Sequence, residues 1–275
     1  MSKFLRAVLL VSLTLLVILP ASQSPAAAQG GDPNLPPTFM VPEVISERPH
    51  DPSAYTQGLL YYDGYLYESA GEYGESTLRK VDPETGEVVR QISVPAEYFA
   101  EGLERIGDHL IQLTWKEDSA FVYDINTFEL LDTITYQGEG WGLCADDRFL
   151  FMSDGSSFIT LRDRDTFDFL FDGMVSIQNQ PVTRINELEC VGDYIYANIY
   201  LTNYILKINK YNGVVEAIID ASGLLTDEEQ AQLASDEVLN GIVYLPDSDT
   251  FLITGKHWPK MFEVRFVEST PPSGQ

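Results

Sequence analysis

The sequence predicts an all-β protein, a five-bladed β-propeller with one short helical insertion. The main observation is an internal repeat, in which a polar or aromatic residue is usually followed by glycine and then by an aliphatic residue. Its copies start 44, 40, 45 and 54 residues apart and are Gln57-Gly58-Leu59, Glu101-Gly102-Leu103, Trp141-Gly142-Leu143, Asn186-Glu187-Leu188 and Asn240-Gly241-Ile242. A period of about 40 to 45 residues with several short strands is typical of propeller blades.

A second apolar strand follows each copy after a turn rich in aspartate or glycine. These strands are Tyr65-Leu66-Tyr67, His109-Leu110-Ile111, Phe149-Leu150-Phe151, Tyr194-Ile195-Tyr196 and Phe251-Leu252-Ile253. A third and a fourth strand follow in most copies, joined by turns such as Tyr211-Asn212-Gly213. A parallel sheet would need helices between its strands. Residues 224–239 are the one candidate, with a helix start at Thr226-Asp227-Glu228-Glu229.

The two ends of the repeat region are expected to close one blade together. The fifth copy ends after its third strand, at residues 261–266, and residues 38–47 precede the first copy. The early segment can supply the missing strand, which would remove an exposed sheet edge. We therefore expect a propeller domain at residues 38–267, a linker at 29–37 and a disordered tail at 268–275.

The first 28 residues have the pattern of a secretory signal peptide. Lys3 and Arg6 precede an apolar run at residues 7–20, and Ala26-Ala27-Ala28 follows. The run is shorter than the roughly 20 residues that span a bilayer. We expect cleavage after Ala28 and a secreted or periplasmic protein. The mature chain would then begin with Gln29.

Composition limits the partners and cofactors. The net charge of −25 disfavours binding to nucleic acid or anionic lipid, and we expect a monomer that leaves the membrane after signal cleavage. Cys144 and Cys190 are compatible with one disulfide or with two buried thiols, and we expect thiols. His50, His109 and His257 lack the spacing of a zinc site, so we expect neither a metal nor another cofactor.

Chemically unlike residues are expected to meet at the propeller axis. The first strand of each blade lines the axis, so the copies contribute Gln57, Glu101, Trp141, Asn186 and Asn240 to one ring. The second strands end near the same axis, at Ser69, Trp115, Asp154, Tyr200 and Lys256. A carboxylate, a lysine, amides and large aromatic rings in one place have the composition of a ligand pocket.

These residues also have purely structural explanations. Trp115 and Trp141 can fill the channel, the ring asparagines can hydrogen-bond neighbouring blades, and Lys256 can form an ion pair with Glu101. Glu101 is the hardest to explain in this way. Burying its carboxylate beside Phe99 and tryptophans costs several kcal/mol unless it is paired or protonated. We therefore expect Glu101 to be functional.

Several motifs at these positions together resemble the plant-type glutaminyl cyclases, the glutamine cyclotransferase family of plants and bacteria. They cover residues 55–264 and are Phe99-Ala100-Glu101-Gly102-Leu103, residues 118–124, Trp141-Gly142-Leu143, Arg184-Ile185-Asn186-Glu187-Leu188-Glu189, Ala197-Asn198-Ile199, Val238-Leu239-Asn240-Gly241-Ile242 and Thr254-Gly255-Lys256-His257-Trp258-Pro259-Lys260. The resemblance implies a five-bladed propeller unrelated to the zinc-dependent animal cyclases.

The resemblance also implies an activity, the conversion of N-terminal glutamine of peptides or proteins to pyroglutamate with release of ammonia. It implies that Glu101 is the general acid/base, and we expect Lys256 and Asn186 to assist it as catalytic residues. We expect the substrate-binding residues to be Tyr55, Gln57, Phe99, Trp115, Trp141, Tyr200 and Asn240. Tyr55 and Tyr200 replace the family's phenylalanine and tryptophan, which affects pocket shape more than reaction class.

Two other functions remain open at this stage. A non-catalytic propeller would bind peptides or sugars through the aromatic mouth without turnover, and it would not need Glu101 beside Lys256. A metal-dependent hydrolase of lactones or phosphate esters would place Glu101, Asn186, Asn240 and Asp154 around a cation, and a chelator would inactivate it. If the chain is a cyclase, Gln29 becomes a candidate substrate of the enzyme itself.

Overall fold

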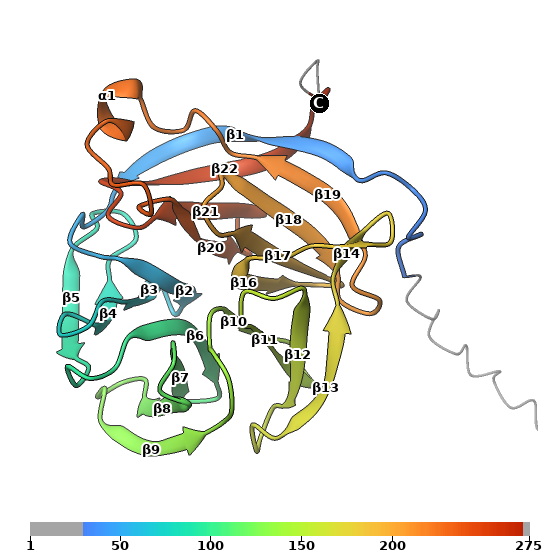
Figure 1. The fold of residues 1–275 in the computed structure, drawn as a ribbon. Coiled ribbons are helices and arrows are strands. Elements are labelled where there is room, and N and C mark those ends of the chain that lie inside the picture. The colour runs from blue at the N-terminus through green and yellow to red at the C-terminus, as the bar shows by residue number, and fades with distance from the viewer. Residues whose placement is uncertain (1–29, 272–275) are drawn as a thin grey trace, which may run out of the picture.

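Four-stranded antiparallel sheets follow one another along the chain (Figure 1). The computed structural model describes residues 30–271. The first three sheets keep their strands in sequence order and comprise β2 (Thr56–Tyr62), β3 (Tyr65–Ala70), β4 (Thr77–Val81) and β5 (Val88–Ser93); β6 (Ala100–Ile106), β7 (His109–Thr114), β8 (Ser119–Asp124) and β9 (Leu130–Thr135); and β10 (Leu143–Ala145), β11 (Phe149–Ser153), β12 (Phe158–Asp163) and β13 (Phe169–Met174). The predicted all-β class and four-stranded unit are confirmed.

The remaining long strands form one eight-stranded sheet. Its two halves are β16 (Ile185–Val191), β17 (Tyr194–Ile199), β18 (Tyr204–Asn209) and β19 (Val215–Asp220), and β20 (Leu239–Leu245), β21 (Thr250–Gly255) and β22 (Lys260–Glu268). Strand β1 (Thr38–Pro49) lies between the halves. It runs antiparallel to β22, from Met40 opposite Glu268 to Pro49 opposite Lys260, and its first residues pair in parallel with β19. The predicted closing strand is therefore confirmed.

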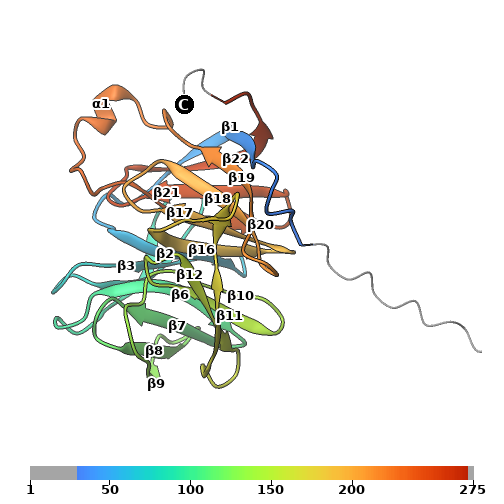
Figure 2. The same ribbon diagram turned by 45° about the vertical axis from the view of Figure 1, so that its right-hand side comes forward.

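The innermost strands of the sheets meet around a common centre, which gives the molecule a propeller-like form (Figure 1). Strands β2, β6, β10, β16 and β20 contact one another in this cyclic order. The turned view in Figure 2 shows β1 and β22 together along one side of the molecule. Residues at equivalent positions of the inner strands are thereby brought to one place.

The glycines of the repeat lie where these inner strands touch. A Cβ added to Gly102 would lie 2.6 Å from the Trp141 carbonyl oxygen, and one added to Gly142 would lie 2.2 Å from the Asn186 oxygen. The Gly102 N–H donates to the Trp141 carbonyl at 2.7 Å, a hydrogen bond between two sheets. Glycine is thus required by the close approach of neighbouring backbones.

Three hairpins between third and fourth strands share one turn. Asp82, Asp124 and Asp163 each accept the backbone N–H groups two and three residues later, together with a threonine hydroxyl. Backbone hydrogen bonds of this kind favour the ionised carboxylate and lower the pKa of each group. A short hairpin, β14 (Ser176–Ile177) with β15 (Gln180–Pro181), follows the third sheet.

A polar insertion separates β19 from β20, as predicted, but its helix is short. Only α1 (Asp227–Gln230) is helical, so the expectation of a helix over residues 224–239 is wrong beyond the first turn. Thr226 and Glu229 form a capping box, in which each side chain accepts the other's backbone N–H. No residue of α1 is buried, and without tertiary packing such a short helix is not extended.

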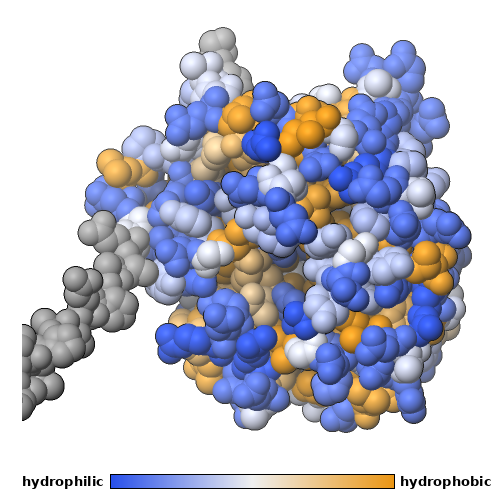
Figure 3. All heavy atoms as spheres, turned by 180° about the vertical axis from the view of Figure 1, so that it is seen from behind, coloured by the Kyte–Doolittle hydropathy of each residue, from blue (hydrophilic) through white to orange (hydrophobic). Residues whose placement is uncertain are grey.

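The core consists of apolar clusters that two neighbouring sheets share. Leu78 of the first sheet packs in one cluster with Leu103 of the second, and Phe151 of the third packs in another with Ile195 of the fourth. The face of the molecule in Figure 3 is mostly hydrophilic, with hydrophobic groups in separate spots. No helix within residues 30–271 is long and apolar enough to cross a bilayer.

The two cysteines are joined, so the expectation of free thiols is wrong. Cys144 of β10 and Cys190 of β16 form a disulfide, with their Cα atoms 5.5 Å apart. They lie on neighbouring inner strands that contact each other, at a separation that suits a disulfide. Sequence spacing gave no sign of this proximity, because 46 residues separate the two cysteines.

The strands extend from Thr38 to Glu268, close to the predicted domain limits. Glu268 itself is paired with Met40, so the ordered strand includes the first residue of the predicted tail. Within the predicted linker, Gly31 accepts a hydrogen bond from the Asn212 side chain at 2.8 Å. The predicted signal peptide and Gln29 lie outside the described residues.

Candidate active site

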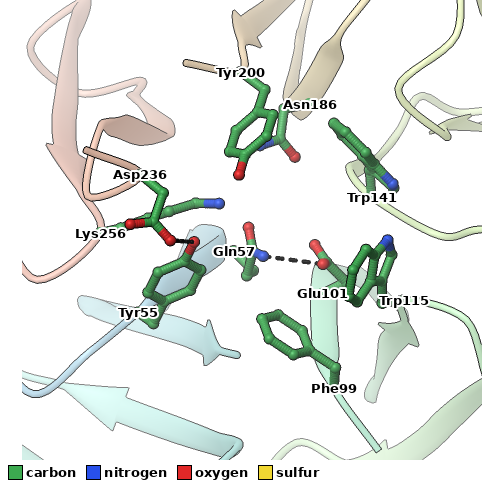
Figure 4. A pocket seen from close by; sticks show the side chains of 10 residues that line it. All are labelled: Tyr55, Gln57, Phe99, Glu101, Trp115, Trp141, Asn186, Tyr200, Asp236 and Lys256. Atoms are coloured by element: carbon green, nitrogen blue, oxygen red, sulfur yellow. Dashed lines mark hydrogen bonds between the residues drawn. The ribbon is translucent and has the colours of Figure 1, made fainter. Parts of the chain in front are cut away.

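A cavity of about 240 Å³ lies among the innermost strands (Figure 4). The polar ends of Gln57, Glu101, Asn186 and Lys256 point toward the same space. Its lining consists of Tyr55, Gln57, Phe99, Glu101, Trp115, Trp141, Asn186, Tyr200, Asp236 and Lys256. All of these except Asp236 were predicted from the sequence.

β-Bulges place three of the lining residues. The ladders of β2, β6 and β16 each shift register at one cavity residue, respectively Gln57, Glu101 and Asn186. A bulge takes a residue out of the ladder and redirects its side chain. The other lining residues stand at strand ends or in loops, for example Trp115 after β7 and Lys256 after β21.

Glu101 is a buried carboxyl group with one oxygen unused. Glu101 is 4% exposed, and its Oε1 accepts a hydrogen bond from Gln57 Nε2 at 2.9 Å. Glu101 Oε2 and Asn186 Oδ1 are buried and have no hydrogen-bond partner within residues 30–271. Since buried polar atoms are normally satisfied, a polar ligand in the cavity would satisfy both atoms.

Burial controls the charge of the two ionisable groups in the cavity. It raises the pKa of Glu101 well above the ordinary value; Lys256 opposes this rise, and the carboxylates of Glu139 and Glu117 add to it. Burial also lowers the pKa of Lys256 to about 8, against the attraction of Glu101 and Asp236. Desolvation therefore has a larger effect on the pKa of Glu101 than the neighbouring ammonium of Lys256.

Glu101 and Lys256 do not form the ion pair considered from the sequence. Within residues 30–271, no ion pair shorter than 4.0 Å involves either side chain. The Lys256 ammonium instead lies 4.5 Å from the ring centroid of Tyr55 and 4.8 Å from that of Tyr200. Cation–π contacts therefore hold the lysine, and its charge remains available to a ligand.

Aromatic rings form the apolar wall of the cavity. Phe99 meets Trp115 edge to face with centroids 5.6 Å apart, and Trp141 meets Tyr200 in the same way at 5.5 Å. Tyr55 completes the wall beside Phe99, at 6.0 Å. Edge-to-face packing fixes the orientation of each ring, so the tryptophans line a defined space and do not simply fill a channel.

Asn240 is not among the lining residues, so the prediction that it binds substrate does not fit its position. It is fully buried, and its Nδ2 donates to the Thr56 carbonyl at 2.9 Å and to Gln57 Oε1 at 3.2 Å. Asn240 thus holds the Gln57 amide, which in turn donates to Glu101. This is the interblade hydrogen bonding weighed from the sequence.

Asp236 is a cavity residue that the sequence reasoning missed. It reaches the cavity from the segment between α1 and β20, and its Oδ2 accepts a hydrogen bond from the Tyr55 hydroxyl at 3.3 Å. The Tyr55 hydroxyl, which we expected to affect the shape of the pocket, therefore has a partner at the cavity. No repeat position pointed to Asp236, because the insertion has no counterpart in the other copies.

The ligand set of the metal-dependent alternative is not assembled. Asp154 is exposed and accepts the Ser156 N–H, and Asn240 lies behind Gln57. In the described part of the chain, no group of three or more histidine, cysteine, aspartate or glutamate side chains is arranged to hold a metal ion.

Comparison with known proteins identifies the family. The model of the family described as Glutamine cyclotransferase matches residues 11–266. The chain belongs to this family. A glutaminyl-peptide cyclotransferase from Arabidopsis thaliana is 35% identical over 234 residues, which cover 84% of this chain and 73% of that protein.

A solved structure supports the same assignment. Glutaminyl cyclase from Myxococcus xanthus is 38% identical to this chain, with a TM-score of 0.79 over 85% of this chain and 100% of that one. The resemblance inferred from motifs is thereby confirmed.

Proposed function

We propose that this protein converts N-terminal glutamine of peptides and proteins to pyroglutamate and releases ammonia, with Glu101 as the proton carrier. Family membership and the two named cyclases support the reaction. The observation that carries the proposal is the buried Glu101 carboxyl, whose free Oε2 faces a cavity walled by indole rings. A cavity of about 240 Å³ is smaller than drug-sized pockets and suits one terminal residue.

In the proposed reaction, the substrate's α-amine attacks the carbonyl carbon of its own side-chain amide. A carbon–nitrogen bond forms, the bond to the amide nitrogen breaks, and ammonia leaves. Glu101 takes one proton from the attacking nitrogen and delivers one to the departing nitrogen. Much of the rate gain comes from holding the side chain folded back, for which Trp115 and Trp141 provide rigid walls.

The raised pKa of Glu101 suits this exchange. A carboxyl of ordinary pKa would hold a proton too weakly to receive one from an amine near neutral pH, whereas an acid–base group works best with a pKa near the operating pH. The desolvated site supplies this change. A free α-amine has a pKa of about 7.7 to 8.0, so proton donor and acceptor are better matched.

Lys256 and Asn186 are the proposed stabilisers of the oxyanion that forms on the substrate carbonyl. The Gln57 amide is not proposed as a third donor, because its Nε2 already donates to Glu101 Oε1. The Lys256 ammonium faces the cavity without an ion-pair partner among the described residues, and its pKa of about 8 keeps most of it charged near neutral pH. Removal of one such donor typically costs about 100- to 1000-fold in rate.

The proposal is tested by ammonia release from a glutamine dipeptide by the purified protein. Glu101→Gln keeps the shape and the hydrogen bond from Gln57 but cannot carry a proton, and we expect kcat to fall by at least about 100-fold. Glu104→Gln, on the same strand but outside the cavity, is the matched control and should retain activity. Full activity of a folded Glu101→Gln protein would remove Glu101 from the mechanism.

The same assay separates the alternatives. Peptide binding without ammonia release by the unmodified protein would favour a non-catalytic propeller, and loss of activity with a chelator would favour a metal-dependent enzyme. Tyr55, Phe99 and Tyr200, with the two cavity tryptophans, are the proposed substrate-binding residues.

The remaining proposals concern the whole chain. Counting each half of the eight-stranded sheet as a blade, with β1 completing the second, gives five blades around the inner strands. We further propose a signal peptide at residues 1–28 and an exported monomer. A disulfide between Cys144 and Cys190 supports export, because structural disulfides persist mainly in oxidising compartments.

A further inference from the structure

Glu139 joins the two tryptophans of the cavity, although it is not itself a lining residue. Its Oε2 accepts a hydrogen bond from Trp115 Nε1 at 2.7 Å and from Trp141 Nε1 at 3.0 Å. Figure 4 shows the two indole nitrogens on the side of their rings away from the cavity. Trp115 follows β7 and Trp141 precedes β10, so one carboxylate oxygen bridges the second and third sheets.

The loop that carries Glu139 is anchored on both sides of it. The Gly138 N–H donates to Asp118 Oδ1 at 3.0 Å, and the Gly140 N–H donates to the Trp115 carbonyl at 3.0 Å. A Cβ on Gly140 would lie 2.2 Å from the Tyr136 hydroxyl, so the loop needs glycine to pack this closely. The carboxylate is therefore held in place by its backbone.

A third contact completes the arrangement. The Lys116 ammonium lies 3.8 Å from Glu139 Oε1 and 3.5 Å from the ring centroid of Trp115. Since an indole N–H is a donor only, two indoles can be joined in this way only through an acceptor. Hydrogen bonds to an ionised acceptor are also stronger than neutral ones. A carboxylate meets both requirements.

We propose that Glu139 is a positioning residue that fixes the separation of Trp115 and Trp141 and thereby the width of the cavity. The aromatic wall consists of two edge-to-face pairs, Phe99 with Trp115 and Trp141 with Tyr200. Glu139 is the hydrogen-bonded link between the pairs. This inference rests on the proposed function, since the cavity must hold a terminal glutamine in its attack-ready shape.

The charge of Glu139 also reaches Glu101. The charged groups that shift the pKa of Glu101 are Lys256, which lowers it, and Glu139 and Glu117, which raise it. Neutralising Glu139 should therefore lower the pKa of Glu101. Glu117 provides the comparison, because it raises the same pKa but accepts no hydrogen bond from an indole. Its donors are the Tyr73 hydroxyl at 2.7 Å and the backbone N–H groups of Phe99 and Lys116 at 3.4 and 3.3 Å, and Glu117→Gln keeps acceptor oxygens for them.

The test compares three variants by steady-state kinetics with a glutamine dipeptide, after ammonia release by the unmodified protein has been established. Glu139→Ala removes the acceptor, and we expect kcat/KM to fall about 10- to 100-fold, because small misplacements of positioning groups have effects of this size. Glu139→Gln keeps an acceptor oxygen and should lose less than threefold in kcat/KM. The acid limb of its profile of kcat/KM against pH should move to lower pH, as should that of Glu117→Gln.

Tryptophan fluorescence provides a readout independent of turnover. Only Trp258 lies outside the cavity, so Glu139→Ala should change the emission and its response to an added peptide, whereas Glu117→Gln should change neither. If Glu139→Ala does not fold, Glu139→Leu keeps the volume and still lacks an acceptor. Unchanged kcat/KM and emission in a folded variant, with an active parent, would overturn the inference. An inactive parent would instead contradict the proposed function.

Discussion

Asp236 connects the insertion to the charge of Lys256 in the cavity. Its carboxylate raises the pKa of Lys256, which burial lowers to about 8. Asp236→Asn keeps an acceptor for the Tyr55 hydroxyl but removes the charge, so the pKa of Lys256 should fall. Because the proposed oxyanion donor is the charged lysine, the alkaline limb of kcat should move to lower pH. A pH series of ammonia release with one peptide measures this shift.

The control for this experiment is Asp147→Asn. Asp147 is exposed and lies outside the cavity lining, so its variant should keep the parent profile. The substrate amine titrates equally in all three proteins. An alkaline limb that stays in place in Asp236→Asn would show that Lys256 does not act as a charged donor or that Asp236 does not control it.

At the residue scale, the sequence predicted those cavity residues whose positions the repeat determines. Glu101 and Asn186 stand at equivalent positions of successive copies, so their convergence follows from the fold alone. Asp236 lies in an insertion with no equivalent in the other copies, so its sequence number carries no information about the axis. Glu139 stands two residues before Trp141, as Phe99 stands two residues before Glu101, but its carboxylate lies outside the cavity lining and was not predicted. Asn240 was predicted to bind substrate because the repeat places it in the ring. The repeat does not determine which neighbour its side chain contacts, and that neighbour is Gln57.

Among the elements, β10 and β16 are joined covalently where other inner strands rely on packing and hydrogen bonds. The Cys144–Cys190 bond closes a segment of 46 residues. Loss of a disulfide around a segment of this length typically costs about 2–4 kcal/mol of unfolding free energy. We expect Cys144→Ser with Cys190→Ser to lower the urea midpoint accordingly. A double variant as stable as the parent would contradict this expectation.

The strands were predictable because each repeat combines alternating apolar residues with turn-forming Asp and Gly. The closing strand was predictable because an incomplete last copy leaves an edge that must be covered. The length of α1 was not predictable, because four helix-favouring residues after a good N-cap do not show whether the following turn packs against the rest of the protein. The disulfide was not predictable either, since it depends on which inner strands become neighbours.

At the scale of the whole molecule, carboxyl groups that are buried (Glu187) or half-buried (Glu104) connect the inner strands. Glu104 Oε2 accepts the Ala145 N–H of β10, and Glu187 Oε2 accepts the Ile242 N–H of β20. Burial raises the pKa of Glu104 to about 7, and it raises the pKa of Glu187 well above the ordinary value. Folding therefore takes up protons at these groups.

These raised pKa values predict that stability falls as the pH rises. The contribution of Glu104 is complete below its ordinary pKa of 4.5 and is lost as the pH rises through about 7. We expect its share of the loss between pH 5 and pH 8 to be roughly 1–3 kcal/mol. Glu104→Gln, which needs no proton to be neutral, should narrow the difference in unfolding free energy between these pH values.

Urea unfolding at the two pH values measures this difference. The exposed Glu75 provides the control, since Glu75→Gln should leave the parent's pH dependence unchanged. An equal dependence in Glu104→Gln and the parent would assign the effect to other groups, of which Glu187 is the first to examine.

The position of β1 determines when the molecule can be completed. Of the strands within residues 30–271, β1 comes first in the sequence, yet it pairs with β19 and with β22, which comes last. Contacts between segments so distant in sequence form late and slowly. The sheets formed by strands close in sequence can assemble in turn, whereas the pairing of β1 with β22 requires both ends of the described domain, so closure of the ring is expected to follow the formation of the other sheets.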